Sequence, residues 1–274
     1  MNNKNAPVGV FDSGIGGLTV VREIMRQIPN EKIVYFGDTA RLPYGSKSKE
    51  TITKYSEQVV RFLQKQEVKA IVVACNTASA YALDEIEQHM TIPILGVVKP
   101  GAKMASGVTE NGRIGVIGTE GTIGSKVYSK YIKEINSRAE IIGKACPLFV
   151  PLVEEGLLQD PVTEEIAKRY LAGLIEMDID TLILGCTHYP LICSTIGEIM
   201  GDKVTLVNPA YETAKELREL LEEKSLLNDE EAKLGDNRYR FYVSDAAEKF
   251  KRFANSIIKY GILSAETVNN IEEY

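Results

Sequence analysis

The sequence lacks the features that would place this chain in a membrane or on a nucleic acid. No stretch approaches the roughly eighteen consecutive apolar residues that a membrane-spanning helix requires. The 32 Lys and Arg residues are outnumbered by 38 Asp and Glu residues, which gives a formal charge of −6 and leaves no broad basic surface. We therefore expect small-molecule ligands, and neither nucleic acid nor a membrane as a partner.

Cysteine and histidine are also scarce, with four and two residues respectively. No two cysteines stand in the C-x-x-C spacing of zinc or redox sites, so no metal is expected. The N-terminus, MNNKNAPVGVFDSG, has neither an apolar segment nor a small-residue cleavage site of a secretory signal. We expect a cytoplasmic protein in which all four thiols stay reduced, namely Cys75, Cys146, Cys186 and Cys193.

The order of short apolar runs and longer amphipathic segments indicates an α/β fold. A chain of 274 residues, 44% of them hydrophobic, suffices for one large domain or two small ones. Helical patterns at 18–28, 166–177 and 210–221 are expected to cover parallel sheets. The expected strands are short and rich in β-branched residues: 8–11, 32–36, 70–74, 92–98, 114–117, 181–184 and 204–207.

A weak internal repeat divides the chain. AIVVACNT (70–77) resembles TLILGCTH (181–188), which sets Cys75 opposite Cys186. VGVFDSGIGG and IGVIGTEGTIG pair Asp12 with Thr119, and ILGVVKPGAKMA resembles VTLVNPAYETAKE. Three pairs in one order predict a duplication, hence two similar parallel-sheet α/β domains with a cleft between them. The predicted domains are 1–98 with 209–274, and 99–208, because the YRFYV segment at 239–243 is expected to pack on the first half.

The two matched cysteines are candidates for chemistry. In open parallel sheets, ligands bind beyond the carboxyl ends of the strands, so Cys75 and Cys186 are expected to face one cleft. The competing interpretation is that free cysteine is a small buried hydrophobe, and this is the expectation for Cys146 and Cys193. A dinucleotide site at DSGIGGLT is excluded, since Thr19 stands where the GxGxxG pattern needs glycine.

Four motifs in order resemble the glutamate racemases of the aspartate/glutamate racemase superfamily: FDSGIGG (11–17), GDTARLPYG (37–45), ACNTAS (74–79) and GCTHYPL (185–191). The resemblance runs from about residue 8 to 208. It implies an isomerase that interconverts L- and D-glutamate without pyridoxal phosphate or metal. It also implies a homodimer and a supply of D-glutamate for peptidoglycan.

Racemisation explains why two thiols are needed. Inverting an α-carbon requires one group to remove a proton from one face and another to deliver a proton to the opposite face. Cysteine, with an ordinary pKa near 8.5, suits both roles after a modest shift. The resemblance implies that Cys75 deprotonates D-glutamate and that Cys186 deprotonates L-glutamate.

The resemblance also implies helpers for each thiol and a set of substrate contacts. Asp12 would stand beside Cys75 and the substrate ammonium, although an Asp before a glycine turn also caps helices. His188 and Glu154 would assist Cys186, although the EE pair in PLVEEG also fits a solvated turn. His89 is expected at the surface or at a helix end. The implied substrate contacts are Asp12, Ser13, Tyr44, Gly45, Asn76, Thr77, Thr187 and His188, with Thr119 and Thr122 as additions.

Two alternatives stay open on sequence grounds. An aspartate racemase of the same superfamily would use the same paired thiols, since both attack Cα whatever the side chain is. A non-catalytic protein could hold an acidic amino acid between two lobes, but it would not need two thiols. A racemisation assay over a small panel of amino acids separates these alternatives.

Overall fold

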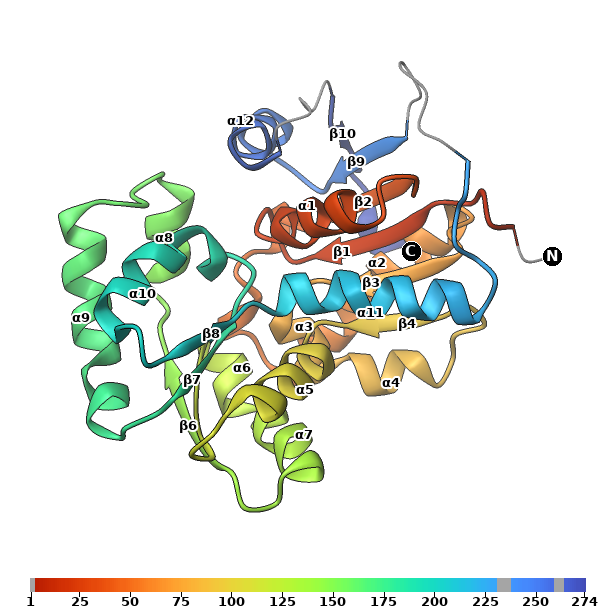
Figure 1. Cartoon of the computed structure of the whole chain (residues 1–274). Helices are drawn as coiled ribbons and strands as arrows, with labels where there is room; N and C mark the ends of the chain where they lie inside the picture. The colour runs from red at the N-terminus through yellow and green to blue at the C-terminus, as the bar shows by residue number, and fades with distance from the viewer. Residues whose placement is uncertain (1–2, 231–237, 259–263) are drawn as a thin grey trace.

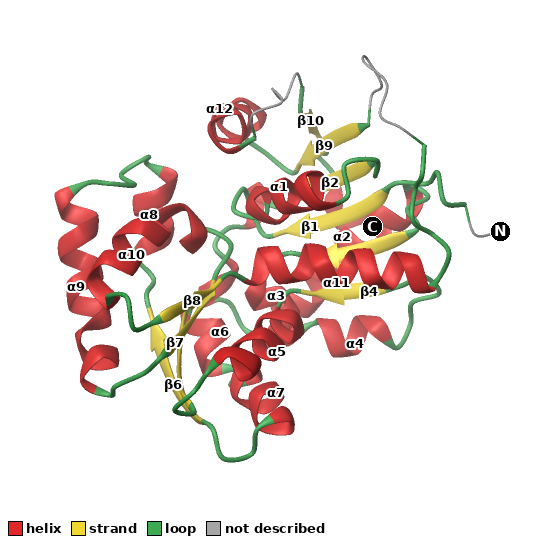
Figure 2. Ribbon diagram, viewed as in Figure 1, coloured by secondary structure: helices red, strands yellow, loops and turns green. Residues whose placement is uncertain are grey.

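The computed structural model describes residues 3–230, 238–258 and 264–274. Within these ranges the chain forms two parallel sheets with helices on both faces (Figure 1, Figure 2), which confirms the predicted fold class. The six-stranded sheet has the order β10-β9-β2-β1-β3-β4, and the four-stranded sheet the order β6-β5-β7-β8. The strands are β1 (Val8–Asp12), β2 (Ile33–Gly37), β3 (Ala70–Val73), β4 (Ile94–Gly96), β5 (Arg113–Gly118), β6 (Glu140–Ala145), β7 (Thr181–Gly185), β8 (Thr205–Val207), β9 (Tyr239–Val243) and β10 (Glu266–Thr267).

Helices connect the strands and bury their apolar faces against the sheets. Two hydrophobic cores lie on opposite faces of the six-stranded sheet, one under α1, α11 and α12 and the other under α2, α3 and α4. The α-helices are α1 (Leu18–Gln27), α2 (Lys49–Lys65), α3 (Asn76–Tyr81), α4 (Leu83–Glu87), α5 (Val98–Val108), α6 (Glu120–Gly124), α7 (Val127–Ile135), α8 (Phe149–Glu154), α9 (Pro161–Glu176), α10 (Cys193–Met200), α11 (Pro209–Glu223) and α12 (Ala247–Ile257). Within the described residues, no helix is both long and apolar enough to cross a membrane.

The central strands form because they are apolar on both sides. Every residue of β1, β2, β3 and β7 is buried, as expected of strands that helices cover on both faces. The face predicted for the first helix is confirmed, because Leu18, Val21, Ile24 and Met25 of α1 all join one core. Asp160 and Asn208 cap α9 and α11, each followed by a proline at the first helical position.

The repeat is visible in the topology. The order β2-β1-β3-β4 of the first sheet recurs as β6-β5-β7-β8 in the second. The register corrects one predicted match. Val8 pairs with Ala70 in one sheet and Ile114 with Thr181 in the other, so with β3 set on β7, Asp12 corresponds to Gly118. Thr119 therefore lies one residue beyond the position that corresponds to Asp12. The sequence match alone contains no strand pairing, so it could not fix this register.

One predicted strand is shorter than expected, and two strands, β6 and β10, were not predicted. The strand expected at 92–98 is limited to Ile94–Gly96, and Val98 already begins α5, whose Pro100 lies in the first turn where its missing N–H costs little. Strand β6 was not predicted. It is an edge strand of intermediate and exposed residues, so it lacks the buried apolar run that marked the others.

The tail packs on the first half, as expected, because β9 pairs with β2 from Ile33↔Tyr239 to Gly37↔Val243. Helix α11 packs on α1 in the same half. The predicted domain limits near residues 98 and 208 stay predictions. Residues 1–2, 231–237 and 259–263 of the predicted first domain lie outside the described residues. On its outer side, β6 has no neighbouring strand in the described part of the chain.

Candidate active site

The two candidate thiols follow corresponding strands. Cys75 comes just after β3 and caps α3, whose Ala78 N–H lies 3.5 Å from its Sγ. Cys186 directly follows β7. Cys75 is 5% exposed and Cys186 is 6% exposed. Burial, the charge of Asp12 and, more weakly, that of Cys186 raise the pKa of the Cys75 thiol to about 12.

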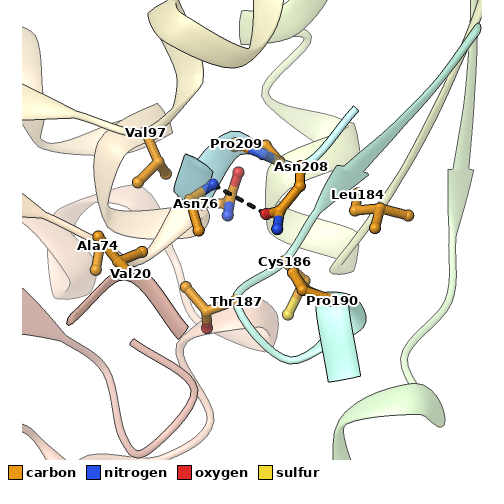
Figure 3. A pocket seen from close by; sticks show the side chains of 11 residues that line it. Val20, Ala74, Asn76, Val97, Leu184, Cys186, Thr187, Pro190, Asn208 and Pro209 are labelled. Carbon is orange, nitrogen blue, oxygen red and sulfur yellow. Dashed lines mark hydrogen bonds between the residues drawn. The ribbon is translucent and has the colours of Figure 1, made fainter. Parts of the chain in front are cut away.

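Residues from both halves meet around a small cavity (Figure 3). Ala74 and Asn76 line it from the first half, and Cys186 and Thr187 line it from the second. The cavity measures about 10 Å³, which is room for about one water molecule. Cys186 therefore faces the segment that carries Cys75.

Asp12 defines the Cys75 side of the site. It is fully buried at the end of β1, and its carboxylate accepts hydrogen bonds from the Gly14 N–H at 2.9 Å and the Thr187 hydroxyl at 3.5 Å. Burial raises the pKa of Asp12, against the opposing charge of His188. The Oγ of Ser13 lies 3.5 Å from the Cys75 Sγ. Asp12 is not the N-cap residue of α1, which follows Gly17, although its carboxylate also bonds the backbone N–H of Gly17.

An imidazole and a carboxylate define the Cys186 side. The Nδ1 of His188 lies 3.8 Å from the Cys186 Sγ, and its Nε2 lies 3.2 Å from the Oε1 of Glu154. The other carboxylate oxygen of Glu154 pairs with the Nζ of Lys249 at 3.4 Å. The structure thus brings together Cys186, His188 and Glu154, and it adds Lys249 from α12.

The electrostatics of this chain favour a charged imidazole. Burial lowers the pKa of His188, but hydrogen bonds to Cys186 and Glu154 outweigh burial and raise the pKa to about 10. Burial raises the pKa of Glu154, but the hydrogen bonds to His188 and Lys249 and the charges of both partners together outweigh burial and leave the pKa below its ordinary value. Glu154 is therefore ionised beside a protonated His188, and the solvated-turn interpretation of this glutamate is wrong.

Three threonine hydroxyls form a cluster across the two halves. The Oγ1 of Thr77 lies 2.9 Å from that of Thr119 and 3.2 Å from that of Thr122. Thr119 caps α6 through the Thr122 N–H, so the helix start fixes the cluster. These hydroxyls can reorient to donate to a carboxylate.

The GDTARLPYG loop closes one side of this cluster. A Cβ on Gly45 would lie 2.6 Å from the Cβ of Thr119, so only glycine permits this approach. Tyr44 is buried, and its hydroxyl donates to Asp38. Its predicted contact with substrate stays a prediction.

The glycine loop after β1 touches the second half equally closely. A Cβ on Gly16 would lie 2.4 Å from the Oγ1 of Thr187 and 2.5 Å from the Nδ1 of His188. The hydroxyl of Thr19 donates to the Thr187 carbonyl at 2.9 Å. These contacts seat the CTH segment of the second half directly against the DSGIGG loop of the first.

The remaining predictions have mixed outcomes. His89 is exposed just after α4, as expected, and Cys146 is buried. Cys193 is exposed rather than buried, because it begins α10 on the side that faces solvent. In the described ranges, no group of three or more His, Cys, Asp or Glu side chains could hold a metal ion.

Two contacts of the site were not foreseen from the sequence. Tyr128 of α7 donates a hydrogen bond to the Oδ1 of Asn76 at 2.6 Å, and Lys249 reaches Glu154 from the C-terminal segment. Both residues occupy ordinary positions in amphipathic helices. Neither follows a strand, so no local signal marks them.

Comparisons with known proteins agree with this arrangement. The model of the Asp/Glu/Hydantoin racemase family matches residues 8–217. A glutamate racemase of Geobacter metallireducens is 51% identical over 251 residues, which cover 92% of each chain. The crystal structure of a glutamate racemase isoform from Bacillus anthracis has a TM-score of 0.94 at 41% identity, covering 98% of this chain and 99% of that one. The glutamate racemase of Francisella tularensis in complex with D-glutamate has a TM-score of 0.91 at 41% identity, covering 99% and 100%.

The chain belongs to the Asp/Glu/Hydantoin racemase family, and it is an isomerase. Within that family its whole length is similar to glutamate racemases, which confirms the resemblance predicted from the four motifs.

Proposed function

We propose that this chain interconverts L- and D-glutamate by proton transfer at Cα between two thiols, without a cofactor. One observation carries the proposal: Cys75 and Cys186 are buried at the ends of corresponding strands in two similar halves, and one cavity is lined by Cys186 and by both chain neighbours of Cys75. A substrate held between the halves would present opposite faces of Cα to the two sulfurs.

The proposed reaction balances with these two groups alone. In the D-to-L direction, the Cys75 thiolate takes the Cα proton and becomes a thiol, while the Cys186 thiol donates its proton to the opposite face and becomes a thiolate. The L-to-D direction reverses both steps. Each transfer is general acid–base catalysis by a positioned side chain. Asp12 assists at Cys75, where it also meets the substrate ammonium, and His188 with Glu154 assists at Cys186.

Hydrogen-bond donors around the cleft would hold the substrate carboxylates. The threonine hydroxyls of 77, 119, 122 and 187, together with Ser13, Asn76 and the Tyr44–Gly45 turn, are the proposed contacts. Neutral donors suit an acidic chain, because no cluster of basic side chains is needed to neutralise the ligand. The complex of the Francisella tularensis relative with D-glutamate supports glutamate as the substrate.

The wider role follows from the product. We propose that the enzyme acts in the cytoplasm as a homodimer and supplies D-glutamate for peptidoglycan. The aspartate alternative is tested by assaying L-aspartate beside L-glutamate with the same preparation, where the proposal expects turnover of glutamate in large excess over aspartate.

Isotope incorporation tests the two-thiol geometry. Unlabelled L-glutamate is converted in heavy water and the reaction is stopped early, then the separated enantiomers are analysed by mass spectrometry. The product should carry deuterium at Cα while unreacted substrate carries little, because the thiol that delivers the proton has exchanged with solvent. Substantial protium in the early D-glutamate would instead indicate a single base that carries the proton across.

A further inference from the structure

A tyrosine outside the predicted site reaches into it from the second half. Tyr128, in α7, is 3% exposed, and its hydroxyl lies 2.6 Å from the Oδ1 of Asn76. Asn76 is the first residue of α3 in the first half, directly after Cys75. The hydrogen bond therefore joins the two halves next to a candidate catalytic thiol.

The tyrosine ring is fixed by its surroundings. A Cβ on Gly185 would lie 3.2 Å from the Cε2 of Tyr128, so the ring packs on the end of β7, directly before Cys186. The rest of the ring lies in an apolar core with Val98, Ile183 and Val207. Such packing holds the hydroxyl at one position relative to Asn76.

This fixed hydroxyl determines which way the asparagine amide faces. A buried phenol must place its proton on an acceptor, and Asn76 is the one partner that the described residues offer to the Tyr128 hydroxyl. An amide can accept only through its oxygen, so the Oδ1 faces Tyr128. The Nδ2 must then point away from Tyr128.

The amide nitrogen is left available for a ligand. Among the described residues the Nδ2 of Asn76 has no hydrogen-bond acceptor, although Asn76 is 5% exposed. Asn76 lines the small cavity beside Cys186 and Thr187 (Figure 3). An N–H donor that has no partner within the protein can donate to a ligand, and a carboxylate placed between the two halves would accept from it.

We propose that Tyr128 is a positioning residue that turns the Nδ2 of Asn76 toward the substrate, where it donates to a substrate carboxylate. The inference rests on the proposed function, because glutamate supplies that carboxylate. Without the tyrosine hydroxyl, the amide is free to rotate by half a turn. Its oxygen would then face the carboxylate and repel it.

The test separates binding from chemistry. Tyr128→Phe should raise the KM for both enantiomers by about tenfold or more, the loss expected for one hydrogen bond to a charged group, while kcat changes less. Tyr131→Phe is the matched control: Tyr131 lies one turn further along α7 and its hydroxyl bonds Asp84 at 3.2 Å on the surface, so KM should not change. In an Asn76→Ala background, Tyr128→Phe should raise KM no further.

Several results would overturn the inference. An unchanged KM in Tyr128→Phe would do so, as would an equal rise in the presence and absence of Asn76. If Tyr128→Phe does not fold, Asn76→Asp replaces it: a carboxylate oxygen in place of the Nδ2 should raise KM at least as much, and an unchanged KM would reject the inference. A wild-type protein that does not racemise glutamate would reject the proposed function itself, before any variant is made.

Discussion

The two sides of the candidate site use opposite charges around the same type of side chain. Beside Cys75 stands a buried carboxylate, Asp12. Burial of the thiol itself, followed by the charge of Asp12, raises the pKa of Cys75 to about 12. Beside Cys186 stands His188, an imidazole whose pKa is raised to about 10 by its partners. The two thiols therefore follow corresponding strands of the two halves, but their charged neighbours have opposite signs.

This difference follows from the register of the repeat. Asp12 corresponds to Gly118, which has no side chain, so the second half has no carboxylate at that place. The second half instead uses the residue two positions after its thiol, His188, and orients it through Glu154 of α8. A two-base racemase requires one thiolate and one thiol at the same time. A carboxylate beside one cysteine and an imidazole beside the other make the two thiols electrostatically different.

The largest expected effect comes from removing either thiol. Cys75→Ser and Cys186→Ser should each lower racemisation in both directions by at least about 1,000-fold, since a serine hydroxyl is too weak a base at neutral pH. A coupled assay or polarimetry measures both directions. Cys193→Ser, on an exposed residue, is the control and should stay active. Near-normal turnover in either active-site variant would remove that thiol from the mechanism.

Replacing the helpers should reveal which thiol each one serves. Asp12→Asn and His188→Asn should each lower kcat by about 100-fold. Because Asp12 lies on the Cys75 side, its loss should increase the isotope effect measured with Cα-deuterated D-glutamate and decrease that measured with the L-enantiomer. His188→Asn should give the reverse pattern. Equal isotope effects in the two variants would contradict the assignment of one helper to each side.

The charge on His188 should also appear in the stability of the protein. Its pKa is raised from an ordinary 6.5 to about 10 in the folded state, so protonated His188 stabilises the fold. This contribution is full below about pH 6.5 and is lost as the pH rises toward about 10. Urea unfolding of wild type and His188→Asn should therefore give free-energy curves that converge over this range. Parallel curves would show that the imidazole carries no such charge.

The smallest effect on activity and stability is expected from replacing Lys249, which pairs with Glu154 on the Cys186 side of the site. Lys249 is half-exposed, so its pair with Glu154 should contribute less than about 1 kcal/mol. Lys249→Ala should lower thermal stability slightly and kcat by no more than a few-fold, with Arg252→Ala on the same helix as the control. A large loss of activity in Lys249→Ala alone would show that Glu154 depends on this lysine.

Much of the fold was predictable because its strands are apolar on both faces, and the two thiols were predictable because they follow such strands. Strand β6 was not, since its residues are half-exposed and carry charge. The exposure of Cys193 depends on which side of α10 faces solvent. The contacts of Tyr128 and Lys249 depend on tertiary packing between the halves, which a local sequence pattern cannot predict.

Strand β9, from the C-terminal segment, also affects how the protein avoids aggregation through the edges of its sheets. A bare sheet edge exposes unpaired N–H and C=O groups that invite pairing with another chain. In the first half β9 occupies the edge of β2, so the sequence IVYFG can be wholly apolar and buried. Its counterpart β6 has no such cover in the described residues and instead carries exposed Glu140 and Lys144, charges that oppose edge-to-edge association. One half is protected from aggregation by a strand, the other by its charges.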